Sequence, residues 1–545
     1  MKSLALEHLP VIASAPGGVK KLRELILQLA VMGKLVPQDT NDEPASDLLR
    51  RIQSERMTLL KAGLLKAEKN PPVVSATDHP YQLPNSWVWV KLGSLTSKIG
   101  AGSTPLGGKQ GYLKAGIKFL RSQNVWDEGL YLDDVAFIPP HVHEKMAGTH
   151  VKPGDLLFNI TGASIGRCAI VPGDFDTGNV SQHVTIVRPL LTELQMFLHK
   201  VLISGQIQKA VMSEQVGVSR EGLSISKLSQ FLIPLPPLAE QHRIVAKVDE
   251  LMDLCDKLEA QQNDSEAAHR LLVKTLLDTL TQTQDADDFA ASWERIKENF
   301  HTLFTTEESV DILKQTILQL AVTRALGSRR SDWTFEKASS LCSKVQSGKT
   351  PKEGFTDTPG VPFLKVYNIV RQELDFEYRP QFIPTALHKG QMNNSCVLPG
   401  DVLMNIVGPP LGKVAIVPDT YMEWNINQAL TAFRPSARCT SKWLYLCLCS
   451  GLTIRGIYTR GTAGQDNISL TQCREMIIPL PPLAEQHRLV AKVDELMALC
   501  DKLKLDIQGS RRLQEQVSSV MLQAAVSREM VYSTESNKNP AMSKV

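Results

Sequence analysis

The stretch Ile233-Pro-Leu-Pro-Pro-Leu-Ala-Glu-Gln-His-Arg-Ile-Val-Ala-Lys-Val-Asp-Glu-Leu-Met-Asp-Leu-Cys-Asp-Lys-Leu258 decides how this chain is organised. The same 26 residues return at positions 478–503, where only Ile244/Leu489 and Asp253/Ala498 differ. Two copies at this long spacing do not indicate a solenoid; they predict two similar domains, each followed by the same helix. The Pro-Pro pair inside the stretch cannot continue a central strand, but it suits the first turn of a helix.

Apolar residues in the repeated stretch recur at alternating steps of four and three, which is the spacing of a coiled-coil seam. The seam positions are Ile244, Val248, Leu251, Cys255 and Leu258, and we expect the seam to resume at Leu272, Leu276 and Leu280. The spacing therefore predicts a long helix over residues 239–281 and a second one over residues 484–528.

Shorter helices are predicted at residues 18–34 and 310–326, which share the segment Ile-Leu-Gln-Leu-Ala-Val. Another helix, predicted at 45–69, has no counterpart in the second half of the chain. We expect helices 239–281 and 310–326 to form an antiparallel hairpin, with a matching hairpin from 18–34 and 484–528. This arrangement would close the chain into a pseudo-twofold molecule.

Between the helices, the periodicity becomes short and is interrupted by Gly, Pro, Asn and Thr, as in strands joined by turns. Strands are predicted at 117–120, 156–160, 168–171 and 184–187, and a helix is predicted at 192–215. Several anchors recur at matched spacing: Gly102-x-Thr104-Pro105 and Gly348-x-Thr350-Pro351, Pro153-Gly154-Asp155 and Pro399-Gly400-Asp401, Asn159 and Asn405, Gln182 and Gln428, and Arg188-Pro189 and Arg434-Pro435. Most residues between the anchors differ, so one fold carries two different surfaces.

The predicted fold class is α+β, with two similar β-rich domains joined by long antiparallel coiled-coil helices in a pseudo-twofold circular arrangement. The predicted boundaries are an N-terminal helical region at 1–80, a first domain at 81–235, a central helical region at 236–326, a second domain at 327–480, a C-terminal helix at 481–530 and a disordered tail at 531–545.

Composition is that of an ordinary globular protein, with 43% hydrophobic and 21% charged residues over 545 positions. Nine cysteines without a Cys-x-x-Cys pair indicate free thiols in a reducing compartment. The longest apolar run, residues 443–449, is too short to cross a bilayer. We therefore expect a cytoplasmic protein without a membrane partner.

Three weaker motifs are better explained as ordinary loop or linker residues than as catalytic or ligand-binding sites. Ser347-Gly-Lys-Thr350 resembles the end of a phosphate-binding loop, but Ser343 stands where that motif needs glycine. Asn70-Pro-Pro-Val73 resembles an amino-methyltransferase signature, yet it lacks the aromatic residue and lies in a proline-rich linker. His141, His143 and His150 were expected to have no counterparts in the second repeat, which argues against a metal site. We therefore predict neither catalytic nor metal-binding residues.

Charge placement points to nucleic acid. The net charge is +3 for residues 81–235, +5 for residues 327–480 and −5 for the remainder. Turn-like stretches of both domains combine cations with residue types that read bases or bind phosphate. The candidate DNA-binding residues are Lys98, Ser103, Thr104, Lys109, Arg121, Gln123, Asn124, Arg220, Lys344, Lys349, Thr350, Lys352, Lys365, Tyr367, Asn368, Arg371, Arg460 and Gln465.

Together these features resemble the specificity subunits of type I restriction–modification systems. The Leu-Pro-Pro-Leu-Ala-Glu-Gln helix start, present twice, is similar to that family's conserved regions. The Gly-x-Thr-Pro and Pro-Gly-Asp-x-Leu segments resemble its target recognition domains. The resemblance covers about residues 18–530, and the helix predicted at 45–69 departs from the internal symmetry.

The resemblance implies a subunit without catalytic activity that reads an asymmetric, bipartite double-stranded DNA site, one half per domain, with the long helices setting the spacing. Two modification (methyltransferase) subunits would dock on the helices, and restriction/translocase subunits would join them. Cofactors would belong to those partners: S-adenosylmethionine for methylation, ATP and Mg for restriction. The alternative is a coiled-coil scaffold with two protein-binding domains, which would show no DNA sequence preference.

Overall fold

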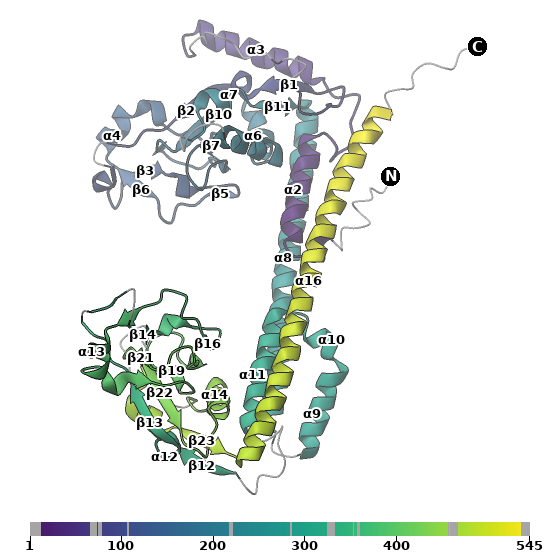
Figure 1. Cartoon of the computed structure of the whole chain (residues 1–545). Coiled ribbons are helices and arrows are strands. Elements are labelled where there is room, and N and C mark those ends of the chain that lie inside the picture. The colour runs from purple at the N-terminus through teal and green to yellow at the C-terminus, as the bar shows by residue number, and fades with distance from the viewer. Residues whose placement is uncertain are drawn as a thin grey trace. The chain divides into compact units, whose positions relative to one another are not determined.

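The computed structural model describes residues 12–65, 74, 79–105, 108–216, 222–283, 286–323, 333–352, 354–356, 360–455, 457 and 467–535. The chain divides into two compact units, one formed by Met1–Gln262 with Leu513–Val545 and the other by Asn263–Arg512. Each unit contains one of the two β-rich domains, together with parts of both long helices (Figure 1). No described helix combines the length and apolarity needed to span a membrane.

The first unit begins with two helices, continues through the first β-rich domain, and ends with helix α8. Its helices and strands are α2 (Gly18–Val31), α3 (Ala45–Lys61), β1 (Val88–Lys91), β2 (Thr96–Ala101), β3 (Ile117–Leu120), β4 (Val125–Trp126), β5 (Gly129–Leu130), β6 (Ala136–Ile138), α4 (Pro140–Lys145), β7 (Leu156–Asn159), β8 (Cys168–Ile170), β9 (Gly178–Val180), β10 (Val184–Pro189), α5 (Gln195–Leu202), α6 (Gly205–Val216), α7 (Ile225–Ser229), β11 (Leu232–Leu235) and the start of α8 (Leu238–Gln282). Short 3-10 turns η2 (Leu92–Leu95), η3 (Gly108–Gly111), η4 (Ser122–Asn124), η5 (Ala147–Thr149) and η6 (Thr192–Leu194) lie between them.

The second unit repeats this order after three connecting helices. Its elements are α9 (Ala286–Glu298), α10 (Phe300–Leu303), α11 (Glu307–Thr323), β12 (Thr334–Lys337), α12 (Ala338–Leu341), β13 (Cys342–Ser347), β14 (Val361–Leu364), η8 (Val366–Asn368), β15 (Ile369–Val370), β16 (Glu373–Leu374), β17 (Phe382–Ile383), α13 (Thr385–Lys389), η9 (Asn393–Ser395), β18 (Cys396–Val397), β19 (Val402–Asn405), β20 (Val414–Ile416), β21 (Trp424–Ile426), β22 (Leu430–Pro435), α14 (Ser441–Cys449), α15 (Leu470–Glu475), β23 (Ile477–Leu480) and the start of α16 (Leu483–Glu535).

The two domains have the same sheet topology, which confirms the predicted repeat. Each holds an antiparallel sheet, ordered β2-β10-β7-β8 in the first domain and β13-β22-β19-β20 in the second. Each also holds a sheet with a parallel centre: β3 pairs with β9 in the order β6-β3-β9, and β14 pairs with β21 in the order β17-β14-β21-β18. The first and last strands of each domain pair as β1–β11 and β12–β23, so the chain enters and leaves at one place.

A buried ion pair ties the antiparallel sheet together in each domain and explains two of the repeated motifs. Arg188 on β10 donates from Nε and Nη2 to the two carboxylate oxygens of Asp155, at 2.6 and 2.8 Å. Arg434 binds Asp401 in the same bidentate way, at 2.7 Å for both bonds. Both aspartates are at most 2% exposed. The Pro-Gly-Asp and Arg-Pro anchors therefore join the start of one strand to its neighbour.

The repeated stretch starts a helix at the predicted place in both copies. The Gln241 side chain donates to the Pro236 carbonyl at 3.0 Å, and the Gln486 side chain donates to the Pro481 carbonyl at 2.9 Å. Both glutamines are at most 1% exposed. Each therefore fastens the first helical turn to the end of its domain, and α8 and α16 begin directly after the Pro-Pro pairs.

Each short helix runs antiparallel to the long helix that follows its own domain. In the first unit, α2 joins α8 through Arg23, which binds Asp256 and Glu259 at 2.6 and 2.7 Å. The equivalent contact in the second unit is Lys314 on α11 with Asp501 on α16, at 2.6 Å. Ion pairs at equivalent positions show that the repeat includes these helices.

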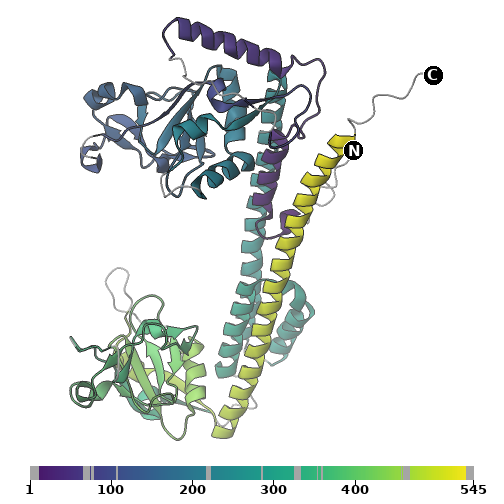
Figure 2. The ribbon, with the colours of Figure 1, turned by 45° about the horizontal axis from the view of Figure 1, so that its top comes forward.

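The predicted hairpin between helices 239–281 and 310–326 is wrong in its direction. Helix α9 reverses the chain after α8, so α11 starts beside the last third of α8 and runs parallel to its end (Figures 1 and 2). Arg270 of α8 binds Glu308 of α11 at 3.0 Å, and His269 contacts the Leu303 carbonyl at 3.0 Å. The sequence analysis did not predict this reversal.

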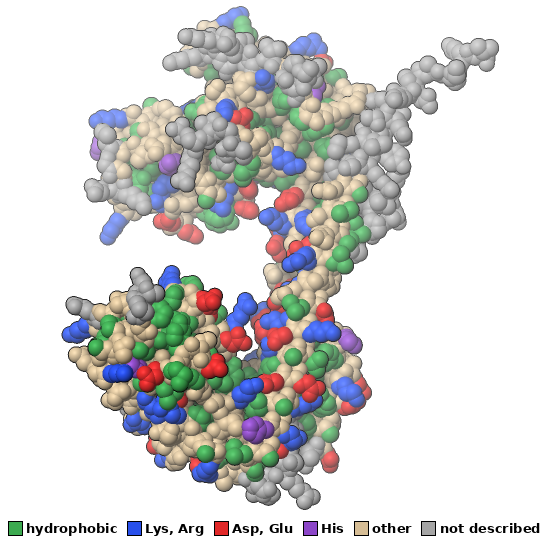
Figure 3. Space-filling model, viewed as in Figure 1, with side chains coloured by type: hydrophobic (Ala, Val, Ile, Leu, Met, Phe, Trp, Pro, Cys, Tyr) green, Lys and Arg blue, Asp and Glu red, His purple; other side chains and the backbone are tan. Residues whose placement is uncertain are grey.

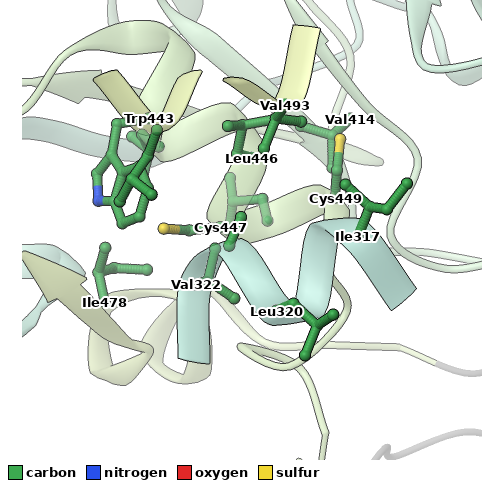
Figure 4. Close-up of a cluster of buried hydrophobic side chains, with 14 of the residues drawn as sticks. Ile317, Leu320, Val322, Val414, Trp443, Leu446, Cys447, Cys449, Ile478 and Val493 are labelled. Atoms are coloured by element: carbon green, nitrogen blue, oxygen red, sulfur yellow. The ribbon is translucent and has the colours of Figure 1, made fainter. Parts of the chain in front are cut away.

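Two of the three predicted positions of the resumed seam are displaced by one residue, and Leu280 is buried as predicted. Val273, Leu277 and Leu280 are the buried positions, whereas Leu272 is 51% exposed. These side chains join a core that contains α11, α14 and the start of α16. Figure 4 shows part of this core, where Val322 and Ile317 of α11 lie near Cys447 and Cys449 of α14.

Other boundaries differ by smaller amounts. Helix α3 ends at Lys61, whereas we predicted residue 69, and the helix predicted at 192–215 breaks at Ser204 between α5 and α6. Helix α16 continues to Glu535, into the region predicted as a disordered tail. Helix α3 packs on the first domain through Ala45, Leu48 and Ile52.

The ion pairs generate a stability prediction. Asp401→Asn should lower the local unfolding free energy of the second domain by about 3 kcal/mol, because it leaves the Arg434 guanidinium without its buried carboxylate. Hydrogen exchange of β19 and β22 measures this change. The control is Asp494→Asn, which breaks the exposed Lys442–Asp494 pair and should cost less than about 1 kcal/mol. Equal effects of the two substitutions would contradict the assigned role.

Candidate nucleic-acid interface

Three loops meet at one edge of the parallel strand pair in each domain. In the first domain, Ser181 N donates to Leu120 O at 2.9 Å, and Ser103 N donates to Val180 O at 3.2 Å. The Gly-x-Thr-Pro loop, the loop after β3 and the turn after β9 are therefore held together. The second domain repeats the arrangement, with Asn427 N to Leu364 O at 3.0 Å and Lys349 N to Ile426 O at 3.1 Å. We call this group of three loops the loop cluster.

The glycine of each Gly-x-Thr-Pro loop is required by a close approach of two backbones. A Cβ atom on Gly102 would lie 2.0 Å from Val180 O, and one on Gly348 would lie 2.2 Å from Ile426 O. No side chain fits at these distances, so the loop can cross the end of the parallel strand only as glycine. The Ser347-Gly-Lys-Thr350 segment is therefore a crossing at the end of β13.

Two predicted base-reading residues are instead part of the loop framework. Asn124 accepts from Arg121 N at 3.0 Å and donates to Tyr131 O at 2.9 Å. Asn368 accepts from Lys365 N at 2.9 Å and donates to Asp375 O at 3.1 Å. Both amides are at most 1% exposed. The prediction that these two asparagines face DNA is wrong, because both side chains are buried and form hydrogen bonds with the backbone of their own loop.

Lys98 and Lys344 are also used inside the fold. Their Nζ atoms donate to the Gly148 and Cys396 carbonyls, each at 2.6 Å. Burial lowers the pKa of both lysines, and the neighbouring guanidinium of Arg188 or Arg434 lowers it further. We remove both from the candidate contact set, since their ammonium groups already hold a turn against β2 or β13.

The remaining described candidates lie on or beside the loop cluster with solvent access. Ser103, Thr104, Gln123, Lys349, Lys352 and Arg371 are exposed, and Arg121, Thr350, Lys365 and Tyr367 are half-buried. Arg220, Arg460 and Gln465 fall outside the described residues, as does the side chain of Lys109; the Asn70-Pro-Pro-Val73 motif also lies entirely outside them.

Several exposed candidates have partners within their own domain. Arg121 and Gln123 both donate to the Asp134 carboxylate, which Arg121 reaches at 3.5 Å. In the second domain, Lys365 Nζ lies 4.7 Å from the centre of the Phe355 ring. The Asp134 side chain is 82% exposed, so its hold on the two donors is weak, and a stronger acceptor can replace it.

The structure adds residues that the sequence analysis did not include. The Arg167 guanidinium stacks on the Trp126 ring at 3.7 Å, and the exposed Tyr131 ring lies against the same indole at 5.6 Å. In the first domain, Thr161 contacts His183 at 2.6 Å.

The second domain adds Gln428, whose side chain accepts from the Thr350 hydroxyl. Gln182 and Gln428 occupy matched positions in the two repeats, which was a usable signal. The stack of Arg167 on Trp126 left no such signal, because these two residues are distant in sequence.

Charges of both signs intermingle on the face of each unit shown in Figure 3. Recognition of a DNA sequence would therefore depend on individual side chains of the loops more than on a broad region of positive charge. Potential metal ligands form one group among the described residues, His388, Cys396 and Glu423 in the second domain.

The chain matches known proteins along most of its length. The type I restriction modification DNA specificity domain matches twice, at residues 86–265 and 330–508. The type I restriction enzyme EcoEI and EcoAI specificity subunits, both from Escherichia coli, are each 31% identical over 93% of this chain and 94% of their own. A solved chain from a type I R-M system is 20% identical, with 82% of this chain and 99% of that chain covered and a TM-score of 0.48.

These matches confirm the resemblance stated from the sequence. The two matched segments correspond to the two β-rich domains with the starts of α8 and α16, and they span more than half of the chain. The chain therefore belongs to the family of type I restriction–modification specificity subunits, which are non-catalytic DNA-recognition components with two recognition domains.

Proposed function

We propose that each recognition domain reads one half of a bipartite, asymmetric double-stranded DNA site through its loop cluster. The observation that carries the proposal is that the two loop clusters have the same backbone arrangement but present different side chains. Ser103, Arg121 and Gln123 of the first cluster correspond to Lys349, Lys365 and Tyr367 of the second. Because the side chains differ while the frame is shared, the two half-sites should differ in sequence.

The charges of the two domains support DNA as the partner. Net charges of +3 and +5 are concentrated in the recognition domains, while the rest of the chain is at −5. Exposed Lys349 and Lys352 are suited to phosphates, which position the protein without reading sequence. Arg121 and Gln123 can exchange exposed Asp134 for guanine or adenine at small cost, since exposed ion pairs contribute about 0–1 kcal/mol.

The long helices are the proposed docking surface for two modification subunits. Lys247, Glu250 and Leu254 share one exposed face of α8, and the identical residues Lys492, Glu495 and Leu499 share one face of α16. The Lys–Glu pairs form in both copies, at 2.8 and 2.9 Å. The leucines are 47% and 56% exposed. Two identical exposed stripes fit two copies of one partner.

The chemistry is proposed to reside in the partners. S-adenosylmethionine would bind the modification subunits, and ATP and Mg would bind restriction/translocase subunits that join the complex. The helices α8 and α16 would set the separation of the half-sites, since each α-helical residue adds about 1.5 Å. A protein-binding scaffold remains the alternative, and sequence preference in DNA binding separates the two.

The role of the loop cluster in DNA binding can be tested by a substitution that adds one methyl group. Gly102→Ala should weaken specific DNA binding by the chain with its modification subunits at least tenfold, because its Cβ forces the Gly-x-Thr-Pro loop away from Val180. Gly173→Ala in the same domain is the control, since a Cβ there meets nothing within 4 Å. Fluorescence anisotropy with cognate and scrambled DNA measures the effect. Unchanged specific binding by Gly102→Ala would contradict the proposed interface.

The docking stripes can be tested by subunit stoichiometry. Leu254→Asp and Leu499→Asp should each remove one modification subunit from the complex, and the double variant should remove both. Leu271→Asp is the matched control, because Leu271 is a 66% exposed leucine of α8 outside the repeated stretch. Native mass spectrometry gives the count. Two bound modification subunits in both single variants would refute the stripe assignment.

A further inference from the structure

The two recognition domains place potential metal ligands at the same position of the fold. His143 on α4 contacts the buried Asn179 of β9 at 2.5 Å, and His388 on α13 contacts the buried Asn425 of β21 at 3.0 Å. His388 is therefore the counterpart of His143. The sequence analysis expected no such counterpart, although Phe137-Ile-Pro139 and Phe382-Ile-Pro384 precede the two histidines at the same spacing.

The next ligand position is also matched by strand register. His150 forms a bridge with Asn179, and Cys396 pairs with Asn425 in the same antiparallel sense. The first domain thus offers two imidazoles, whose rings stack at 3.8 Å with an angle of 9°. The second domain offers an imidazole and a thiol.

Only the second domain supplies a third ligand within the described residues. Glu423 lies two residues before Asn425, where the first domain has Thr177 before Asn179. The ligand atoms of His388, Cys396 and Glu423 all lie within 4.8 Å of one another. His388 Nε2 and the Glu423 carboxylate oxygen are 3.2 Å apart.

These separations suit a tetrahedral ion. With bonds of about 2.0–2.1 Å to nitrogen or oxygen and about 2.3 Å to sulfur, ligand atoms of a tetrahedral zinc site lie roughly 3.3–3.7 Å apart. The observed nitrogen–oxygen distance of 3.2 Å, which is a hydrogen bond in this structure, is about 0.1 Å shorter than such an edge, so a small outward shift would admit the ion. Imidazole, thiolate and carboxylate together favour zinc over magnesium or calcium, which prefer oxygen ligands alone.

We propose that the second recognition domain binds one zinc ion through His388 Nε2, Cys396 Sγ and the Glu423 carboxylate, with water in the fourth position. Glu423 is half-exposed and Cys396 is partly exposed, so the ion can enter from solvent. The ion would join α13, β18 and the start of β21, which are already connected by the β18–β21 pairing and the His388–Asn425 hydrogen bond. Its role is structural, since it braces the sheet whose parallel pair carries the loop cluster.

The surrounding residues can support this site. Binding at Nε2 leaves the ring proton on Nδ1, which then needs an acceptor. Asn179 already presents Oδ1 to His143 Nδ1 while its amide nitrogen donates to Met146 O at 3.2 Å. In this structure Asn425 instead presents Nδ2 to His388 Nδ1 at 3.0 Å, and its Oδ1 accepts from Ile426 N at 3.1 Å, so zinc binding requires the Asn425 amide to turn over.

Cobalt is the probe for the ligand set. The full chain, treated with chelator and titrated with Co²⁺, should bind one equivalent with a thiolate-to-cobalt charge-transfer band, and Zn²⁺ should displace it. Cys396→Ser should remove the band, and Glu423→Gln, at a half-exposed position, should weaken binding at least tenfold. Cys255→Ser on α8 is the control and should leave the spectrum unchanged. A chain that binds no cobalt, or a band that persists in Cys396→Ser, would overturn the proposal.

A second measurement uses the unmodified chain, so it does not depend on the folding of variants. Zinc should slow alkylation of Cys396 by iodoacetamide at least tenfold, as followed by peptide mass spectrometry, while Cys255 should react at the same rate with and without zinc. An alkylation rate of Cys396 that zinc does not change would likewise overturn the site.

Discussion

The parallel pairs β3–β9 and β14–β21 bring the loops of each recognition domain together. Parallel strands end at the same edge of a sheet, so the chain segments after Leu120 and Val180 must start side by side. The Gly-x-Thr-Pro loop then crosses this edge, which only a glycine permits at the observed distance. Three segments far apart in sequence thereby form one surface, and the proposed reading of DNA depends on it.

The residues that the two domains share mostly build this frame. Asp155 with Arg188 and Asp401 with Arg434 fix the antiparallel sheet, and Asn124 and Asn368 close the loops after β3 and β14. Polar side chains are satisfied inside the fold in these places, because an unpaired buried polar group is costly. The positions that differ between domains remain free to determine sequence specificity.

The same contrast between shared and differing positions explains the proposed assembly. A partner that binds both helices must meet the same side chains twice, and the repeated stretch presents Leu254 and Leu499 each beside the same Lys–Glu pair. The proposed DNA half-sites would place the opposite demand on the loop clusters, since each cluster would select different bases. One duplicated unit therefore contains a surface that is kept identical and a surface that is diversified.

The sequence predicted the repeated architecture well, because long amphipathic helices and matched anchors leave strong periodic signals. The α8 and α16 starts at the Pro-Pro pairs were predicted within one residue. The sequence-based prediction failed where tertiary contacts determine the structure. The reversal at α9 depends on packing, and the buried positions Val273 and Leu277 follow from that packing.

The candidate DNA contacts were predicted by residue type and loop position, which cannot distinguish a buried amide from an exposed one. Lys98, Asn124, Lys344 and Asn368 were misassigned for this reason. The stack of Arg167 on Trp126 was missed because 40 intervening residues separate its members in the chain.

The central claim is that each loop cluster reads its own half-site independently of the other. The most direct test replaces residues 81–235 with a second copy of 327–480 and maps methylated adenines by long-read sequencing in cells that express the modification subunits. The account predicts an inverted-repeat target whose two halves both match the half-site read by the second domain. Retention of the original asymmetric target would contradict it.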